Sequence, residues 1–273
     1  MITGYSTLSN MRVPYVVLGD ATPEILVIPG IEPEHRVPEG LRLQGVRGAF
    51  EELAEKRTVA VAWRADRPAS ELTLATMASD YVDLVRELEL TDVAIVGIST
   101  GCPMAIETAA RLGRRCSRLA LVAGGAYLSQ EGQSLLRRSA TLAEQGRWRE
   151  LARDQIAAFY PNVFGRLVLA SIAWLFPGLY GEPDDSDYFV AITSAVVDAD
   201  LRSRAEDVSA RALVVNGERD LLYPPAIARE TALLLTDADV VTIPRAGHGA
   251  FKSHARRINR LLEGFLDPAS AER

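Results

Sequence analysis

The sequence has few cysteines and histidines, and it has no apolar run long enough to cross a membrane. Two cysteines in 273 residues, Cys102 and Cys116, exclude the disulfide framework of a small secreted domain. The most apolar run, residues 167–176, is about half as long as a membrane-spanning helix. The chain opens without the basic, apolar and small-residue pattern of a signal peptide. We therefore expect a cytoplasmic protein with no membrane span.

Positive charge is also scarce relative to negative charge. The chain has 30 lysines and arginines against 36 aspartates and glutamates, a formal net charge of −6. This balance argues against a nucleic-acid partner. The densest basic run, from Arg111 to Arg118, falls where a predicted helix ends and cations complement the helix dipole. The length suits one large α/β domain, with or without an insertion.

Short apolar segments alternate with amphipathic segments along most of the chain. An opening hairpin is predicted from residues 3–6 and 11–18. Apolar strands are predicted at residues 24–28, 58–63, 93–98, 118–123, 212–216 and 239–243, and helices at residues 41–55, 77–88, 102–112 and 253–266. Apolar strands that alternate with helices indicate a parallel sheet covered on both faces. The predicted fold class is α/β, with a mostly parallel sheet of about eight strands.

This alternation stops between Leu128 and Asp207, where only helices are predicted: 133–144, 148–159, 163–176 and 187–198. A helical block between two strands of a parallel sheet must lie over an edge or an end of the sheet. We therefore divide the chain into a core domain, residues 1–127 and 208–273, and an inserted helical cap, residues 128–207. The apolar run 167–176 is interpreted as a buried helix, and docking to a membrane or a partner is the alternative.

Residues 97–101 read Gly-Ile-Ser-Thr-Gly and lie between a predicted strand and a predicted helix. This is the setting of a nucleophile elbow, in which a strained turn projects the serine hydroxyl above the sheet. The tight crossing leaves little room for side chains at Gly97 and Gly101, Pro103 suits the first helical turn, and Gly113 ends the helix. Unpaired N–H groups of the helix point toward negative charge that forms at the serine. A serine in an ordinary glycine-rich loop is the alternative interpretation.

His248 is the preferred candidate for a base that activates this serine. It lies between two glycines just beyond the strand that ends at residue 243, where the backbone is free to bring the ring over a site. The other two histidines are less suitable, because His35 lies in a polar loop and His254 lies within the closing helix.

An acid that orients the histidine is expected after the strand 212–216. Asp220 and its rival Glu218 both lie in the turn that follows this strand. Asp220 is preferred because Ser99, Asp220 and His248 each follow the carboxyl end of a separate strand. In an open parallel sheet, sites assemble along that edge.

The order Ser99, Asp220 and His248, together with the elbow and the turns Gly-Glu-Arg-Asp and Gly-His-Gly, resembles the α/β-hydrolase fold family over residues 11–266. The resemblance implies that Ser99 is the nucleophile, His248 the base and Asp220 the orienting acid. It also implies an oxyanion hole formed by the backbone N–H groups of Ile31 and Thr100.

The loop before Ile31 departs from the usual pattern of the family, and Cys102 directly follows the elbow. Many relatives carry His-Gly before the oxyanion residue, whereas this chain carries Pro29 and Gly30. Proline removes a side-chain hydrogen bond from the loop and stiffens its backbone. Cys102, early on the elbow helix, has two interpretations: a thiol with a lowered pKa, or a small buried packing residue.

The resemblance implies acyl transfer through Ser99 on an ester, thioester or lactone, without a metal ion or an organic cofactor. Carbon–carbon hydrolysis, a non-hydrolytic step in natural-product biosynthesis, and a ligand receptor on a hydrolase scaffold are the alternatives. The expected partner is a small molecule, and a homodimer is compatible with the sequence.

The substrate is expected to be bulky and largely apolar, because about half of the aromatic residues lie in the inserted segment. Trp174 and Phe176 are the predicted pocket residues. The polar loop at residues 32–36 is predicted to supply orienting groups at the rim.

Overall fold

The computed structural model describes residues 2–6, 11–32, 36–159, 168, 171 and 185–267. Its centre is an eight-stranded sheet in the order β1-β2-β4-β3-β5-β6-β7-β8. Neighbouring strands from β4 to β8 are parallel, and β2 is antiparallel to β1 and β4. The strands are β1 (Ile2–Tyr5), β2 (Pro14–Leu18), β3 (Ile25–Ile28), β4 (Val59–Ala62), β5 (Val93–Ile98), β6 (Cys116–Val122), β7 (Arg211–Gly217) and β8 (Ala238–Ile243). The predicted fold class is confirmed.

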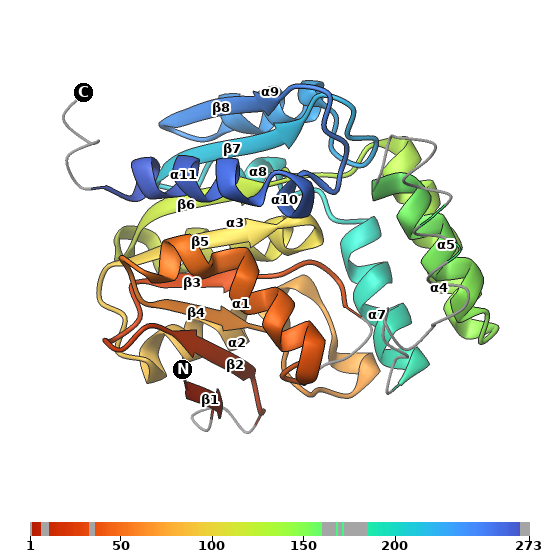
Figure 1. The fold of residues 1–273 in the computed structure, drawn as a ribbon, viewed down its shortest axis with the longest axis horizontal. Helices are drawn as coiled ribbons and strands as arrows, with labels where there is room; N and C mark the ends of the chain where they lie inside the picture. The colour runs from red at the N-terminus through yellow and green to blue at the C-terminus, as the bar shows by residue number, and fades with distance from the viewer. Residues whose placement is uncertain are drawn as a thin grey trace.

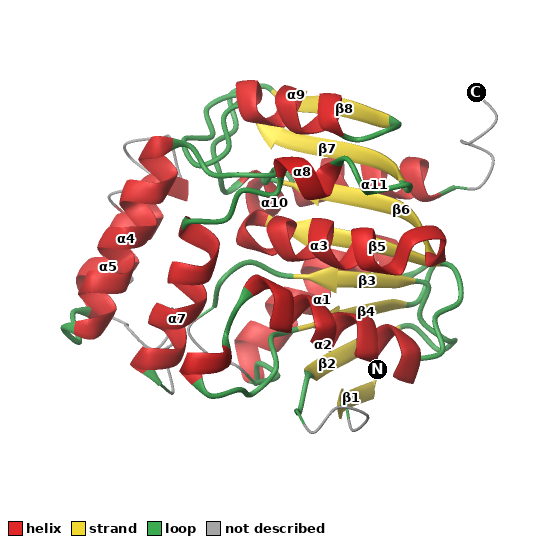
Figure 2. Ribbon diagram, turned by 180° about the vertical axis from the view of Figure 1, so that it is seen from behind, coloured by secondary structure: helices red, strands yellow, loops and turns green. Residues whose placement is uncertain are grey.

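Helices cover both faces of this sheet. In front of it in Figure 1 lie α1 (Gly40–Ala54), α10 (Ala250–Ser253) and α11 (Ala255–Leu266). On the opposite face, in front in Figure 2, lie α2 (Leu74–Glu87), α3 (Cys102–Leu112), α8 (Arg202–Ala205) and α9 (Pro225–Leu234). The predicted closing helix 253–266 corresponds to α11, and the short helix α10 precedes it, with His254 between the two. The sequence pattern did not predict α9, which buries only Ile227, Ala228 and Thr231.

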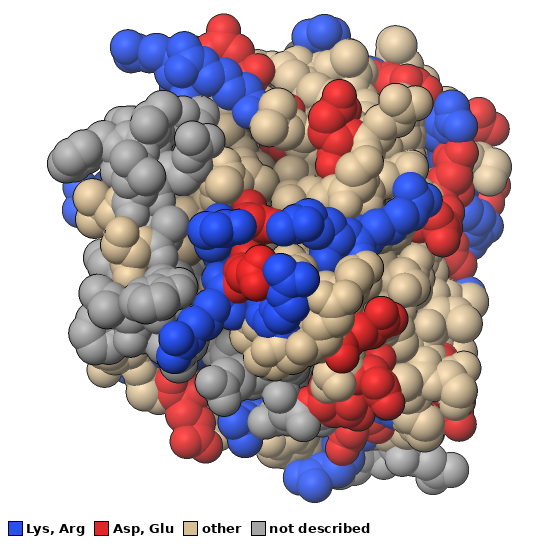
Figure 3. Space-filling model, turned by 90° about the vertical axis from the view of Figure 1, so that its right-hand side faces the viewer, with Lys and Arg blue, Asp and Glu red and all other residues tan. Residues whose placement is uncertain are grey.

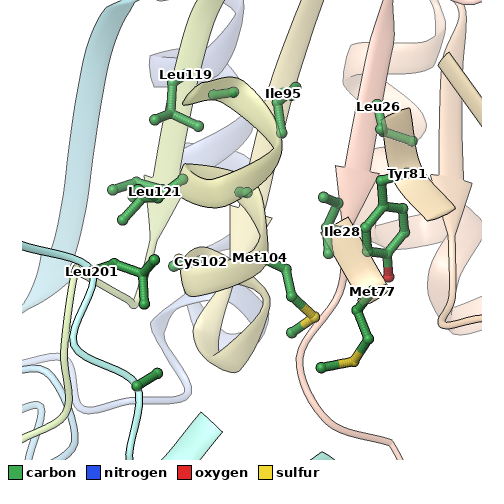
Figure 4. Close-up of a cluster of buried hydrophobic side chains, with 14 of the residues drawn as sticks. Leu26, Ile28, Met77, Tyr81, Ile95, Cys102, Met104, Leu119, Leu121 and Leu201 are labelled. Carbon is green, nitrogen blue, oxygen red and sulfur yellow. The ribbon is translucent and has the colours of Figure 1, made fainter. Parts of the chain in front are cut away.

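Side chains alternate between the two faces along the inner strands, so the sheet has a hydrophobic core on each side. One cluster joins Val27, Val96 and Val122 to side chains of α1 and α11. The other cluster joins β3, β5 and β6 to α2 and α3, and its members in Figure 4 include Ile28, Met77, Tyr81, Ile95, Met104 and Leu121. The inner strands are therefore apolar on both faces.

Of the described helices between β6 and β7, α8 covers a face of the sheet, and three others do not: α4 (Gln130–Glu144), α5 (Trp148–Phe159) and α7 (Ser186–Val197). We call them the inserted helices. They lie beside the sheet, at the end toward which the parallel strands point (Figures 1 and 2). α4 packs against both α5 and α7.

The inserted helices have a small core of their own, which includes Leu142, Leu151 and Phe189. The predicted helix 163–176 lies outside the described residues, apart from positions 168 and 171. The division into a core domain and a cap of residues 128–207 stays a prediction. No helix within the described ranges is long and apolar enough to span a membrane.

The turn from β5 into α3 passes very close to the loop after β3. Ser99 has a left-handed φ of +54°, which costs roughly 1–3 kcal/mol for a residue other than glycine. A Cβ on Gly101 would lie 2.2 Å from the carbonyl oxygen of Ile28, and a Cβ on Gly97 would lie 2.7 Å from Cβ of Ala105. Neither glycine can gain a side chain unless the backbone or α3 moves, as the sequence pattern predicts for a nucleophile elbow.

This close approach predicts that Gly101→Ala destabilises the protein. We expect its free energy of unfolding to fall by about 2 kcal/mol or more, since overpacking typically costs roughly 1–3 kcal/mol. The matched control is Gly264→Ala in α11, where an added Cβ meets no atom within 4 Å. That variant should keep its stability or gain up to about 1 kcal/mol. Denaturant unfolding measures both values, and equal stability of the two variants would contradict the steric account.

Candidate active site

Three residues predicted from the sequence meet at the carboxyl edge of the sheet. The Oγ atom of Ser99 lies 2.7 Å from Nε2 of His248. Nδ1 of His248 lies 2.9 Å from Oδ2 of Asp220 and 3.1 Å from Oδ1. A neutral imidazole with its proton on Nδ1 donates to Asp220 and accepts from the serine hydroxyl. The geometry therefore allows His248 to accept the hydroxyl proton of Ser99.

The carboxylate and the imidazole are both held in place by the residues around them. Oδ1 of Asp220 accepts the backbone N–H groups of Leu222 at 2.9 Å and Tyr223 at 3.0 Å. The imidazole of His248 lies between the ring of Phe159, with centroids 5.1 Å apart, and the stacked ring of Tyr223, with centroids 6.0 Å apart. His248 is fully buried, so its ring cannot turn without displacing these neighbours.

The rival candidates from the sequence are not part of this arrangement. Oε2 of Glu218 accepts the backbone N–H of Arg245 at 2.6 Å, so this carboxylate stabilises a turn. Nδ1 of His254 lies 2.9 Å from the hydroxyl of Ser253, at the junction of α10 and α11. His35 lies outside the described residues.

The loop after β3 places Ile31 beside the serine, as the sequence predicts. A Cβ on Gly30 would lie 3.3 Å from Cβ of Ser99 and 3.4 Å from Oγ1 of Thr100, so the loop backbone contacts the elbow directly. The N–H of Ile31 donates to Oγ1 of Thr100 at 2.6 Å. The family resemblance implied both residues at this place, through their backbone N–H groups. It did not predict the hydroxyl that accepts one of those groups.

A cavity of about 720 Å³ includes Ser99 in its lining. The inserted helices contribute Leu136, Leu151, Ala152, Ile156 and Phe189. The sheet and the helices α1 and α11 contribute Val61, Val96, Ile98, Phe50, Ile258 and Leu262. A mostly apolar cavity of this volume is typical of a small-molecule site.

The predicted pocket residues Trp174 and Phe176 lie outside the described residues. Other aromatic side chains of the inserted helices do line the cavity: Trp148, Phe159 and Phe189. From the polar loop at residues 32–36, Glu32 lies in the lining. Its carboxylate accepts from Nε1 of Trp63 at 3.0 Å and from the guanidinium of Arg42 at 3.4 Å. A polar group thus stands at one side of an apolar cavity.

Comparison with known proteins assigns the family. A sequence model described as the alpha/beta hydrolase family matches residues 26–261. The chain belongs to the alpha/beta hydrolase family.

Several known proteins are similar to this alpha/beta hydrolase. The mouse protein named serine hydrolase BPHL is 23% identical over 268 residues, covering 95% of this chain and 84% of the relative. The solved enol-lactonase from Burkholderia xenovorans is 21% identical, with a TM-score of 0.79 over 96% of this chain and 99% of that chain. The alpha/beta hydrolase MGS-M2 from a deep-sea metagenome library is 18% identical, with a TM-score of 0.82 over 96% of each chain. At these identities the solved structures establish a shared fold.

A buried arginine holds the loop that carries Ile31 in this alpha/beta hydrolase. Arg64 follows β4 and is 4% exposed. Its guanidinium donates to the carbonyl oxygen of Gly30 at 2.7 Å and to that of Pro29 at 3.0 Å. These two bonds hold the backbone carbonyls of Pro29 and Gly30, and with them the loop that carries Ile31. The sequence pattern did not predict this role of Arg64, and its one signal there was a charged residue directly after the apolar segment 58–63.

Cys102 is a packing residue. Its side chain is fully buried, and its thiol donates to the carbonyl oxygen of Gly97 at 3.3 Å. Burial raises the pKa of this thiol far above its usual range. Figure 4 shows Cys102 within the core cluster beside Leu121 and Met104. The interpretation of Cys102 as a thiol with a lowered pKa is therefore wrong.

Charges of both signs lie next to one another on the face that Figure 3 presents. The inserted helices also form ion pairs: Arg138 with Asp154 at 2.5 Å, Arg147 with Glu150 at 2.6 Å, and Arg137 with Asp198, which follows the last residue of α7, at 2.9 Å. Exposed pairs of this kind add little stability. Because charges of both signs are mixed in Figure 3, the described part of that face does not present a field of one sign that would steer a charged ligand.

Proposed function

We propose that this alpha/beta hydrolase cleaves an ester, thioester or lactone by acyl transfer through Ser99. The observation that carries the proposal is the continuous hydrogen-bond chain from the Ser99 hydroxyl through His248 to Asp220. A nucleophile, a base and an orienting carboxylate in this geometry are what covalent acyl transfer requires. Two of the similar proteins, the mouse serine hydrolase and the solved enol-lactonase, have names that support the same class of reaction.

In the proposed mechanism, Nε2 of His248 takes the hydroxyl proton while Oγ of Ser99 attacks the carbonyl carbon. The negative charge that forms on the carbonyl oxygen is stabilised by hydrogen-bond donors of the elbow, among them the backbone N–H of Thr100. His248 then protonates the leaving group, and a water activated by the same ring releases the acyl group. Asp220 keeps the imidazole in one tautomer and stabilises the imidazolium.

The proposed substrate is a bulky, largely apolar small molecule. The cavity of about 720 Å³ supports this choice, because it is larger than an acetyl group requires and its lining is mostly aliphatic and aromatic. Burial of apolar substrate surface contributes roughly 25 cal/mol per Å². A substrate that fills the cavity therefore binds better than a short-chain ester.

The nucleophile is tested by covalent labelling. We predict that a fluorophosphonate adds one adduct to the wild type and that peptide mass mapping places it on Ser99. Ser99→Ala should take no label and should lose hydrolysis of aryl esters by a factor on the order of 10⁴ or more. Retained turnover in the alanine variant, or an adduct on another residue, would overturn the proposal.

The role of Asp220 as the orienting acid is tested by comparing variants of two carboxylates that lie two positions apart. Asp220→Asn should lower kcat by a factor on the order of 10⁴, since the amide no longer selects the required tautomer of His248. Glu218→Gln should stay near wild-type activity, because its carboxylate bonds to the N–H of Arg245 instead. Steady-state kinetics on one aryl ester compares the two, and a larger loss at Glu218 would reverse the assignment.

The size of the acyl group is tested by narrowing the cavity. Ala152→Leu in α5 adds a side chain to the lining, and we expect kcat/KM for large aromatic or long-chain acyl esters to fall by about tenfold or more, with acetyl esters little affected. Ala157→Leu, on the same helix and outside the described lining, is the control. Wild-type preference for acetyl esters, or equal effects of the two variants, would contradict the proposed substrate class.

A further inference from the structure

The Thr100 hydroxyl lies where the proposed reaction needs hydrogen-bond donors. Its Oγ1 accepts the N–H of Ile31 at 2.6 Å. Thr100 directly follows Ser99 and is 3% exposed, and both residues line the cavity together with Gly30 and Ile31. The hydroxyl thus bridges the elbow and the loop after β3.

The hydrogen bond to Thr100 occupies the backbone N–H of Ile31, so this N–H does not point freely into the cavity. The N–H has one proton, and that proton is directed at Oγ1 of Thr100. A hydroxyl accepts with a lone pair and still has its own proton to donate. Within the described residues, the bond from Ile31 is the only hydrogen bond of the Thr100 side chain. The proton of the hydroxyl is therefore free to bind an acceptor that enters the cavity.

We propose that the Thr100 hydroxyl donates to the oxyanion and that the Ile31 N–H acts through it, an inference that rests on the proposed acyl transfer at Ser99. As the Oγ–carbon bond forms, the π electron pair of the carbonyl moves to oxygen and the serine proton passes to His248. Thr100 keeps its proton and donates a hydrogen bond to the new oxyanion, beside its own backbone N–H. Donation from Ile31 polarises the hydroxyl and strengthens it as a donor.

Two features keep the hydroxyl in this position. Arg64 donates hydrogen bonds to the carbonyl oxygens of Pro29 and Gly30, and these bonds keep the Ile31 N–H within hydrogen-bond distance of Thr100. Thr100 is buried and β-branched, so few side-chain rotamers are open to it. The competing account is that the hydroxyl only covers the Ile31 N–H and turns away when substrate binds.

Thr100→Val separates the two accounts, because valine keeps the shape of the side chain and lacks the hydroxyl. We expect kcat on an aryl ester to fall about 10²-fold with little change in KM, since loss of one oxyanion donor costs roughly 10²–10³ in rate. Thr100→Ser retains the hydroxyl and should stay within about fivefold of the wild type. A valine variant as fast as the wild type, or faster, shows that the hydroxyl only covers Ile31 and overturns the inference.

Inhibition by an aryl trifluoromethyl ketone adds a readout that a purely structural role would not change. Its adduct with a serine carries an oxyanion, so its Ki should rise in Thr100→Val by about the factor that kcat falls. The Ki of the corresponding alcohol, which forms no adduct, should stay constant. Unfolding midpoints check the fold, and Thr100→Ala replaces the valine variant if that variant does not fold.

Fluorophosphonate labelling distinguishes failure of this inference from failure of the proposed function. A wild type without an adduct on Ser99 overturns the proposed function. A wild type labelled on Ser99, together with an undiminished kcat in Thr100→Val, overturns only the role of the Thr100 hydroxyl.

Discussion

Backbone contact between the elbow and the loop after β3 is the constraint on which the site depends. Gly101 leaves no room for a side chain beside the carbonyl oxygens of Ile28 and Pro29, and Ser99 is held at a left-handed φ. Roughly 1–3 kcal/mol of backbone strain persists here because β3 and β5 are neighbours inside a sheet buried on both faces. The serine hydroxyl and the N–H of Ile31 consequently share one rigid support.

The histidine side of the site depends on a second close approach, between the end of β7 and the turn after β8. A Cβ on Gly217 would lie 2.5 Å from the carbonyl oxygen of Ala246, so these two segments also pack backbone to backbone. Gly249, next to His248, donates its N–H to the carbonyl oxygen of Phe159 at 3.0 Å. The last residue of α5 therefore helps to position the imidazole as well as lining the cavity.

Buried polar groups around the site are held at some cost in stability. Within the described residues, Nε of Arg64, Oδ1 of Asn216 and the hydroxyl of Tyr223 are buried without a hydrogen-bond partner. An unsatisfied buried polar atom costs roughly 1–3 kcal/mol. Yet the same three residues support the site: Arg64 holds the loop after β3, Asn216 bonds to the carbonyl of Tyr223, and Tyr223 stacks on His248. Functional sites often depart from the packing rules of the core in this way.

The sequence alone determined the fold class and predicted Ser99, Asp220 and His248, because apolar strands and glycine-flanked turns are local patterns. The sequence favoured Asp220 over Glu218 only by its position after the carboxyl end of a strand. The tertiary structure separates the two carboxylates, because Glu218 accepts the N–H of Arg245. The bond from Ile31 to Thr100 joins residues 69 positions apart, and Arg64 reaches the loop after β3 from 34 positions away. Their meeting depends on the order β4-β3-β5 in the sheet, and no local pattern encodes that order.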